Sequence, residues 1–123
     1  MRVLLIEDED HIREIAQLSL ESIAGWQVLA ASGGTEGLAV AVRERPDAVL
    51  LDVMMPDLDG PSTLSALRAH PETAEIPVVF LTAKARAGEQ QELRQLGAAG
   101  VIKKPFDPMT LADQVAEALG WTL

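Results

Sequence analysis

Four carboxylates follow the first apolar run of the sequence without a break. The run VLLI, residues 3–6, leads directly into Glu7, Asp8, Glu9 and Asp10. Such a cluster is often a solvated loop or the first turn of a helix, where the helix dipole favours negative charge. Carboxylates held close together are also the ligands that hard divalent cations take up. The cluster alone is compatible with both interpretations, so the residues that meet it in space have to separate them.

Other apolar runs also end in polar residues that could join this cluster. Asp52 follows the run at 47–51, Thr82 follows the run at 76–81, and Lys103 and Lys104 follow the run at 98–102. In open parallel sheets, ligands bind beyond the carboxyl ends of the strands. If the runs are parallel strands, carboxylates, a hydroxyl and a lysine converge there from four segments of the chain.

These residue types fit the chemistry of phosphoryl transfer. A carboxylate can attack phosphorus to form an aspartyl-phosphate, and we expect Asp52 to be that nucleophile. Asp8 and Asp52 would hold Mg²⁺, or Mn²⁺, which neutralises charge on the phosphoryl oxygens. Lys104 would pair with the phosphoryl group as a point charge, and Thr82 would donate its hydroxyl to it. Each residue alone could be an ordinary helix cap or exposed charge, but buried carboxylates gathered in one place need a compensating cation.

Only one of the two lysines can face such a site. Successive residues of a strand point to opposite faces, so Lys103 and Lys104 cannot both turn inward. Lys104 precedes Pro105, which restricts it to an extended conformation and makes the peptide bond between them a candidate for the cis form. We therefore expect Lys104 to face the site and Lys103 to be a solvated charge.

The spacing of apolar residues predicts the elements that position these groups. Five continuous apolar runs, at 3–6, 26–31, 47–51, 76–81 and 98–102, are typical of strands covered on both faces. Segments with a spacing near 3.6 alternate with them. The residues that mark their faces are Ile12, Ile15, Ser19 and Ile23; Leu38, Ala41 and Val42; Leu64 and Leu67; Leu93 and Leu96; and Leu111, Val115, Ala118 and Leu119. Strict alternation predicts an α/β fold with a parallel sheet and helices on both faces.

Composition limits the class of protein and its partners. A chain of 123 residues fits one domain, residues 1–123, and a content of 48% apolar and 3% aromatic residues predicts a core of aliphatic side chains. The formal net charge of -9 opposes direct binding to nucleic acid or to an anionic membrane. The chain has no cysteine, which excludes disulfides and thiolate metal sites, and its N-terminus resembles neither a signal peptide nor a membrane span. We expect a cytoplasmic protein.

The motifs around the polar residues resemble the receiver domain of two-component response regulators, over essentially the whole chain. The matching stretches are the acidic pair after the first run, LDVMMPDLDG at 51–60, FLTA at 80–83 and IKKPF at 102–106. The resemblance implies a flavodoxin-like, doubly wound (βα)5 fold with strand order 2-1-3-4-5. It also implies a signalling switch rather than a turnover enzyme, in which a sensor histidine kinase or a histidine phosphotransfer protein phosphorylates Asp52.

The resemblance further implies a role for each matching position. Asp8 and Glu7 would bind magnesium, Glu7 largely through water, and Met54 would offer its backbone carbonyl to the same ion. Thr82 and Lys104 would sense the phosphoryl group, and the bond between Lys104 and Pro105 would be cis. By this division, Glu9 and Asp10 remain solvated acids at the start of the first helix.

The resemblance also predicts where the signal leaves the domain. Residues at about 85–119 would form the surface that changes and that meets a downstream protein partner or a second copy of the chain, although its mixed charges fit an ordinary solvated face equally well. Many receiver domains carry an aromatic switch residue where this chain has Val101, so we expect a smaller shift by packing alone. Met54 and Lys84 would flank the line of water attack on the aspartyl-phosphate, and apolar Met54 should slow hydrolysis.

Two alternatives concern the kind of protein. A degenerate receiver could serve as a phosphorylation-independent interaction scaffold with the same residues. A haloacid-dehalogenase-type phosphatase also uses an aspartyl nucleophile, but it needs a second acid at the position of Met54. Only GWTL follows the last helical segment, which favours a stand-alone regulator over a domain excised from a longer protein.

Overall fold

Strands and helices alternate along the chain. In the computed structural model, which describes residues 1–83 and 86–123, five strands alternate with five helices. The elements are β1 (Arg2–Ile6), α1 (Asp10–Ala24), β2 (Gln27–Ala31), α2 (Gly34–Glu44), β3 (Ala48–Asp52), α3 (Gly60–Ala69), β4 (Val78–Thr82), α4 (Ala87–Gln95), β5 (Gly100–Lys103) and α5 (Leu111–Leu119). The predicted alternation is confirmed, but Asp52 and Thr82 are the last residues of their strands rather than the first residues beyond them. The strands extend because the hydrogen-bond ladder continues, from Val53 N to Leu81 O at 3.0 Å and from Lys104 N to Thr82 O at 2.7 Å.

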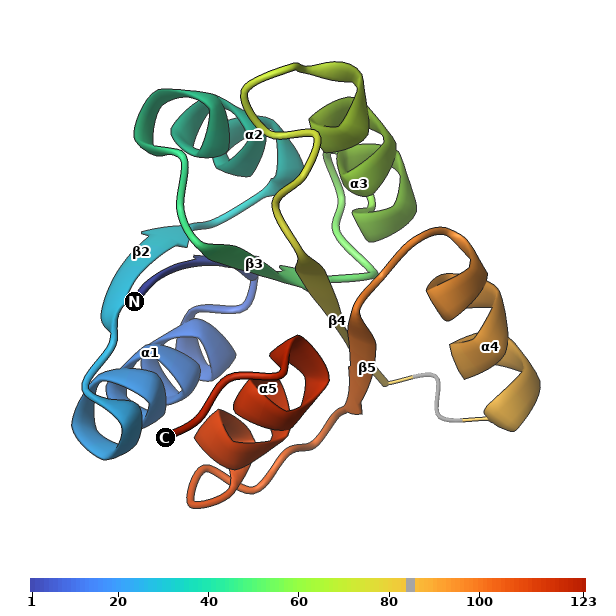
Figure 1. Ribbon diagram of the computed structural model, residues 1–123. Coiled ribbons are helices and arrows are strands. Elements are labelled where there is room, and N and C mark those ends of the chain that lie inside the picture. The colour runs from blue at the N-terminus through green and yellow to red at the C-terminus, as the bar shows by residue number, and fades with distance from the viewer. Residues whose placement is uncertain (84–85) are drawn as a thin grey trace.

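The strands form one parallel sheet in the order β2-β1-β3-β4-β5. This order confirms the flavodoxin-like topology that the sequence resemblance implied. α1 and α5 cover one face of the sheet, and α2, α3 and α4 cover the other (Figure 1). The strand order reverses between β1 and β3, so the carboxyl ends of these two strands lie where sheets of this kind bind ligands.

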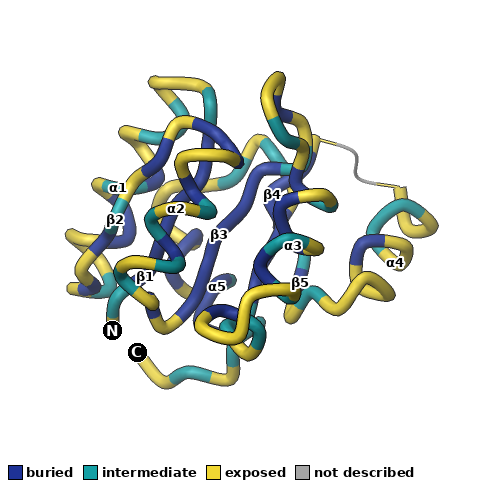
Figure 2. Tube along the Cα trace, turned by 90° about the horizontal axis from the view of Figure 1, so that it is seen from above, coloured by how far each residue is buried: buried dark blue, intermediate teal, exposed yellow. Residues whose placement is uncertain are grey.

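The central strands β3 and β4 are buried on both faces, which explains their continuous apolar runs (Figure 2). Side chains alternate between two core clusters: Leu50 belongs to the cluster under α1 and α5, whereas Leu51 and Phe80 belong to the cluster under α2, α3 and α4. By the same alternation, Asp52 falls on the side of α1 and α5, and Thr82 falls on the side of α3 and α4. These two polar residues therefore end their strands on opposite faces.

The predicted apolar face of α1 is partly wrong. The structure buries Ala16, Ser19 and Leu20, while Ile15 and Ile23 are exposed. Small residues face the sheet because α1 also packs beside α5, and the Ser19 hydroxyl donates a hydrogen bond to the Pro108 carbonyl in the loop before α5. The buried face of α1 is thus rotated about the helix axis relative to the predicted face, and Ile15 and Ile23 lie on the surface.

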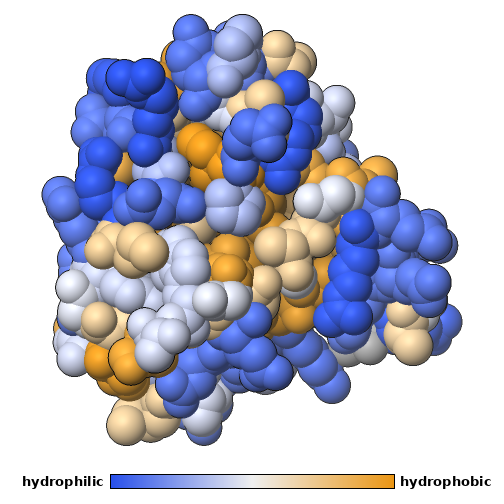
Figure 3. Space-filling model, in the orientation of Figure 1, coloured by the Kyte–Doolittle hydropathy of each residue, from blue (hydrophilic) through white to orange (hydrophobic). Residues whose placement is uncertain are grey.

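α4 packs more lightly than the other helices. Leu93 is its one buried residue, whereas four residues of α5 are buried. In Figure 3 the part of the molecule that α4 occupies is mostly hydrophilic, and hydrophobic residues are visible between the helices. A helix that buries so little apolar surface can shift at small energetic cost.

None of the helices in the described part of the chain is long and apolar enough to cross a membrane.

α2 approaches β1 closely through Gly37. A Cβ atom at this position would lie 2.6 Å from Cγ1 of the fully buried Ile6. We predict that Gly37→Ala lowers the free energy of unfolding by about 1 to 3 kcal/mol, because the added methyl group must displace packed core atoms. Urea denaturation measures this change.

Gly88→Ala in α4 is the matched control. A Cβ atom there meets none of the described residues outside its own stretch of helix within 4 Å. Its effect should be neutral or stabilising by up to about 1 kcal/mol, because alanine has the higher helix propensity. If the two variants proved equally stable, the close contact of α2 with β1 would be refuted.

Candidate functional site

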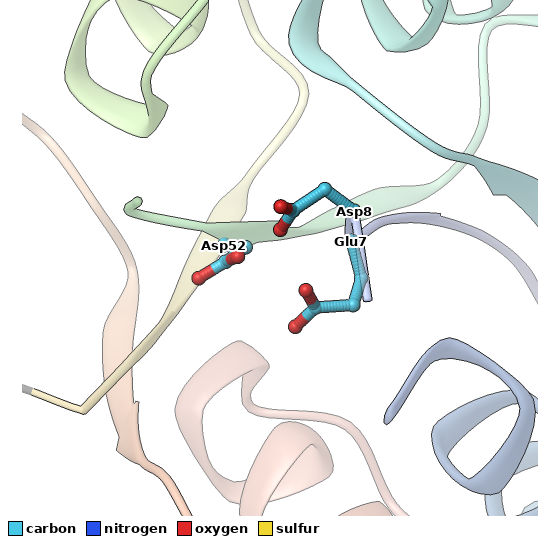
Figure 4. Close-up of side chains that lie close together, drawn as sticks. All are labelled: Glu7, Asp8 and Asp52. Atoms are coloured by element: carbon cyan, nitrogen blue, oxygen red, sulfur yellow. The ribbon is translucent and has the colours of Figure 1, made fainter. Parts of the chain in front are cut away.

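Three carboxylates meet at the carboxyl ends of β1 and β3 (Figure 4). The strands pair with Ile6 opposite Leu51, which brings the following residues, Glu7 and Asp52, side by side. One carboxylate oxygen from each of Glu7, Asp8 and Asp52 lies within 4.8 Å of the others. Glu7 and Asp52 are buried, and Asp8 is half-buried. The tertiary structure therefore gathers the acids that the sequence analysis selected.

Lys104 is the cation of this cluster. Its Nζ atom lies 2.5 Å from Glu7 Oε1 and 3.1 Å from Asp52 Oδ1, and its side chain is 13% exposed. The peptide bond between Lys104 and Pro105 is cis. Lys103, the neighbouring residue, is exposed and pairs in register with Thr82. The structure thus places Lys104, and not Lys103, beside the acids.

Burial and like charge control the ionisation of Asp52. Burial and, to a lesser extent, the negative charge of Glu7 together raise the pKa of its carboxyl group to about 7, although the hydrogen bond from Lys104 works in the opposite direction. Burial also opposes the charge of Lys104, but its hydrogen bonds to Glu7 and Asp52 outweigh this effect and raise the lysine pKa. The lysine is therefore firmly charged, whereas Asp52 titrates near neutral pH.

The acids fit a divalent cation. With Glu7, Asp8 and Asp52 ionised, three negative charges face the single positive charge of Lys104 and leave two uncompensated. Glu7 Oε1 is fully buried, and the ammonium group beside it, Lys104 Nζ, is shared with Asp52. Mg²⁺ takes oxygen ligands and carries the missing charge. Glu7, Asp8 and Asp52 are therefore suitable ligands for a hard divalent ion.

A cavity of about 340 Å³ gives access to this cluster. It is lined by Asp8, Glu9, Ile12, Asp52, Met54, Ala83, Lys104 and Pro105. Met54 lies at its rim in the loop after β3, with its side chain 61% exposed. The cavity provides room for a phosphoryl group beside Asp52.

Thr82 and Val101 lie outside this cavity. Thr82 is buried at the end of β4 and lines a separate hollow of about 610 Å³, which Val53, Pro61 and Leu93 also line. Val101 is half-buried and pairs with Phe80, on the same side of β4 as Thr82. The structure therefore brings Glu7, Asp8, Asp52 and Lys104 together. It places the two expected switch residues, Thr82 and Val101, on the opposite face of the sheet.

Arg13, which no sequence motif singled out, also contacts the acidic run. Its guanidinium group donates a hydrogen bond to the Glu7 carbonyl at 2.9 Å and pairs with Asp10 at 2.5 Å. Glu9 is the N-cap residue of α1, and both Glu9 and Asp10 are exposed, as expected for acids at a helix start. The spacing of three residues between Asp10 and Arg13 is the one sequence signal for this contact.

The raised pKa of Asp52 predicts a pH-dependent cost of folding. The folded protein holds the Asp52 proton more tightly than the unfolded chain, so stability is lost as the pH rises from about 4 through the folded pKa of about 7. In metal-free buffer at pH 8, Asp52→Asn should therefore raise the free energy of unfolding by about 1 to 3 kcal/mol, and the gain should fade toward pH 4. Urea titrations at several pH values measure it.

Asp47→Asn is the control for this experiment. Asp47 is an exposed residue just before the amino-terminal end of β3, and its carboxylate accepts a hydrogen bond from the Arg2 amide at 2.7 Å. This variant should show no such gain. Added Mg²⁺ should stabilise the wild-type protein more than Asp52→Asn. A wild-type protein that is at least as stable as Asp52→Asn at pH 8 without metal would contradict the cost assigned to Asp52.

Comparisons with known proteins agree with this geometry. The family model for the response regulator receiver domain matches residues 3–116. A chemotaxis response regulator of Vibrio cholerae, CheY4, superposes with a TM-score of 0.88 at 32% identity, over 95% of this chain and 97% of that one. The receiver domain of the sensor histidine kinase PA1611 from Pseudomonas aeruginosa, which has a magnesium ion coordinated in its active site cleft, superposes with a TM-score of 0.85 at 30% identity, over 97% of each chain.

Curated relatives are longer proteins. The DNA-binding dual master transcriptional regulator RpaA of Synechocystis is 38% identical over 86% of this chain and 44% of its own length. A probable transcriptional regulator, ycf27, of Porphyridium aerugineum is 37% identical over 96% of this chain and 48% of its own. The chain therefore spans about half the length of the curated relatives it matches. By its sequence, its strand order and its match over residues 3–116, the chain belongs to the response regulator receiver domain family.

Proposed function

We propose that the chain is a phosphorylation-dependent switch of a two-component system. In this proposal, Asp52 accepts a phosphoryl group from a phosphohistidine of a sensor histidine kinase or a histidine phosphotransfer protein. The observation that carries the proposal is the position of Asp52: it is buried beside Glu7 and Asp8, 3.1 Å from Lys104, and lines a cavity. Receiver domains are signalling proteins rather than turnover enzymes, and the chain would take up one phosphoryl group in each cycle.

Each residue of the cluster has a distinct part in the transfer. An Asp52 oxygen attacks phosphorus, so that an O–P bond forms while the P–N bond to the donor histidine breaks and its electron pair returns to the ring. Lys104 holds its ammonium group beside the attacking carboxylate and can pair with a phosphoryl oxygen. Glu7, Asp8, Asp52 and the Met54 carbonyl would hold Mg²⁺, which supplies neutralising charge when bound. Because these cations favour the ionised form of Asp52, they keep the nucleophile in its reactive state.

The donor protein has an apolar surface to dock on beside the cavity. Ile12, Ile15, Phe106 and Pro108 line a small hollow of about 160 Å³, which shares Lys104 with the cluster. Ile15 is 47% exposed and Leu18, further along α1, is 65% exposed. We infer that the histidine-bearing partner covers these residues, since an apolar contact next to the cavity would bring its phosphohistidine to Asp52.

Phosphorylation would change the charge balance that the unmodified site maintains. The new group adds roughly 1.5 to 2 negative charges, and Lys104 would turn from Glu7 toward it. The Lys104 amide donates to the Thr82 carbonyl, so a shift at β5 is transmitted to the end of β4 and to the hollow under α4. We infer that the lightly packed α4 moves and that Val101 adjusts by packing. The surface of α4, β5 and α5 would then meet a second copy or a downstream protein.

Direct contact with nucleic acid is not proposed for this chain. RpaA is named as a DNA-binding regulator, but the chain matches 44% of that protein's length, and its own net charge is -9. A polyanion would be repelled by such a surface.

Intact mass after incubation with acetyl phosphate and Mg²⁺ tests the proposed function. We expect a single phosphoryl adduct on the wild-type protein and none on Asp52→Asn, because the variant lacks the nucleophile. Removal of Mg²⁺ with EDTA should lower the rate of adduct formation at least about tenfold. Absence of an adduct under every metal condition would instead support the scaffold that works without phosphorylation.

Met54 should lengthen the lifetime of the aspartyl-phosphate, because its exposed apolar side chain stands at the rim of the cavity. Met54→Asn should shorten the phosphorylated half-life by roughly threefold or more, since a polar side chain can hold the attacking water. Met54→Leu, which keeps an apolar side chain, is the control and should leave the half-life near that of the wild type. A half-life that is unchanged or longer in Met54→Asn would show that this role is wrong. Lys84, the other residue expected to flank the line of attack, lies outside the described residues.

A further inference from the structure

The loop between β3 and α3, residues 53–59, is fastened to the start of α2. Asp57 Oδ2 accepts a hydrogen bond from the Thr35 amide at 3.0 Å, and Asp57 Oδ1 accepts one from the Gly34 amide at 3.3 Å. Gly33, the N-cap residue of α2, has no side chain to satisfy these amides. Asp57 therefore supplies the cap from a segment 22 and 23 residues away in the sequence.

Two glycines allow this contact. A Cβ atom on Gly33 would lie 2.8 Å from Asp57 Oδ2, and one on Gly34 would lie 2.5 Å from the Leu58 carbonyl oxygen. Any larger residue would push the loop away from α2. The Thr63 hydroxyl, which also abuts Gly34, donates to the Asp59 carbonyl at 2.8 Å and so ties the same loop to α3. The carboxylate cap and the glycine pair thus form one close junction between the loop, α2 and α3, which lie side by side on one face of the sheet (Figure 1).

Other contacts also hold the loop on either side of Met54. The two ends of the loop are closed by the hydrogen bond from Gly60 N to Val53 O at 2.8 Å. Within the loop, Met55 packs into the core under α2 and α3, while Met54 is exposed. Asp57 follows Met55 by two residues and provides the hydrogen bonds that join this stretch to another helix.

We propose that Asp57 is a positioning residue, which holds the loop against α2 and so fixes the Met54 backbone beside Asp52. This inference rests on the proposed function, because it assumes that the Met54 carbonyl contributes to a Mg²⁺ site. Groups that orient a metal ligand commonly change metal affinity by an order of magnitude or more. The amides of Thr35, Leu58 and Gly34 hold the pKa of Asp57 at about 2, so the cap stays charged at neutral pH.

Calorimetric titration of the metal-free full chain with Mg²⁺ tests the proposal. Asp57→Ala should weaken Mg²⁺ binding by roughly 3- to 10-fold and slow phosphorylation by acetyl phosphate at subsaturating Mg²⁺. Asp57→Asn removes the same charge but keeps one of the two acceptor oxygens, so its Mg²⁺ affinity should lie between those of the wild type and Asp57→Ala. Asp47→Ala removes a carboxylate that also accepts a backbone N–H, just before the amino-terminal end of β3, and should leave Mg²⁺ binding unchanged.

A double-mutant cycle with Gly33→Ala ties the effect to the junction. The added methyl group should displace the Asp57 carboxylate and weaken Mg²⁺ binding in the wild-type background, but add nothing in the Asp57→Ala background. Amide hydrogen exchange at Gly34 and Thr35 should accelerate in Asp57→Ala. The inference is overturned if Asp57→Ala binds Mg²⁺ as Asp47→Ala does, or if the effects of Gly33→Ala and Asp57→Ala simply add. A wild-type protein that forms no phosphoryl adduct would refute the proposed function, whereas normal wild-type phosphorylation with an unaffected Asp57→Ala would refute the positioning role alone.

Discussion

The site depends on one ammonium group that balances several buried carboxylates. Lys104 lies within 3.1 Å of both Glu7 and Asp52, at the point where β1 and β3 end side by side. Carboxylates so close together disfavour one another's ionised form, and burial adds to this effect. With its acids ionised, the site therefore carries negative charge that Lys104 does not balance and that a divalent cation would compensate.

The parallel sheet places Asp52 and Thr82 on opposite faces. Asp52 ends β3 on the side of α1 and α5, whereas Thr82 ends β4 on the side of α3 and α4 and lines a different hollow. A backbone hydrogen bond, from the Lys104 amide to the Thr82 carbonyl, joins the two sides. α4 follows β4 with only Leu93 buried among its residues. Two buried central strands, β3 and β4, thus lie between the charged cluster and a lightly packed helix, which the proposed switch requires.

Two residues outside the strands, Arg13 and Asp57, hold segments near the site. Arg13 holds the Glu7 carbonyl from α1, and Asp57 joins the loop after β3 to α2. Neither side chain lines the cavity around Asp52, yet each supports a segment that does. Positioning of this kind comes from helices that are distant in sequence, so the precision of the site is a property of the whole domain.

The amino-acid sequence was enough to predict the alternation of strands and helices and the strand ends that carry polar residues. Its resemblance to receiver domains divided the acidic run between Glu7–Asp8 and the start of α1. Periodicity and turn residues encode the alternation locally, and strand alternation together with Pro105 was enough to select Lys104 over Lys103. The distances within the cluster, the raised pKa of Asp52, the exposed face of α1 and the contact of Asp57 with Gly34 could not be predicted from the sequence. These depend on how segments far apart in the chain pack together, and a local pattern fixes the side to which a residue points but not the neighbour it meets there.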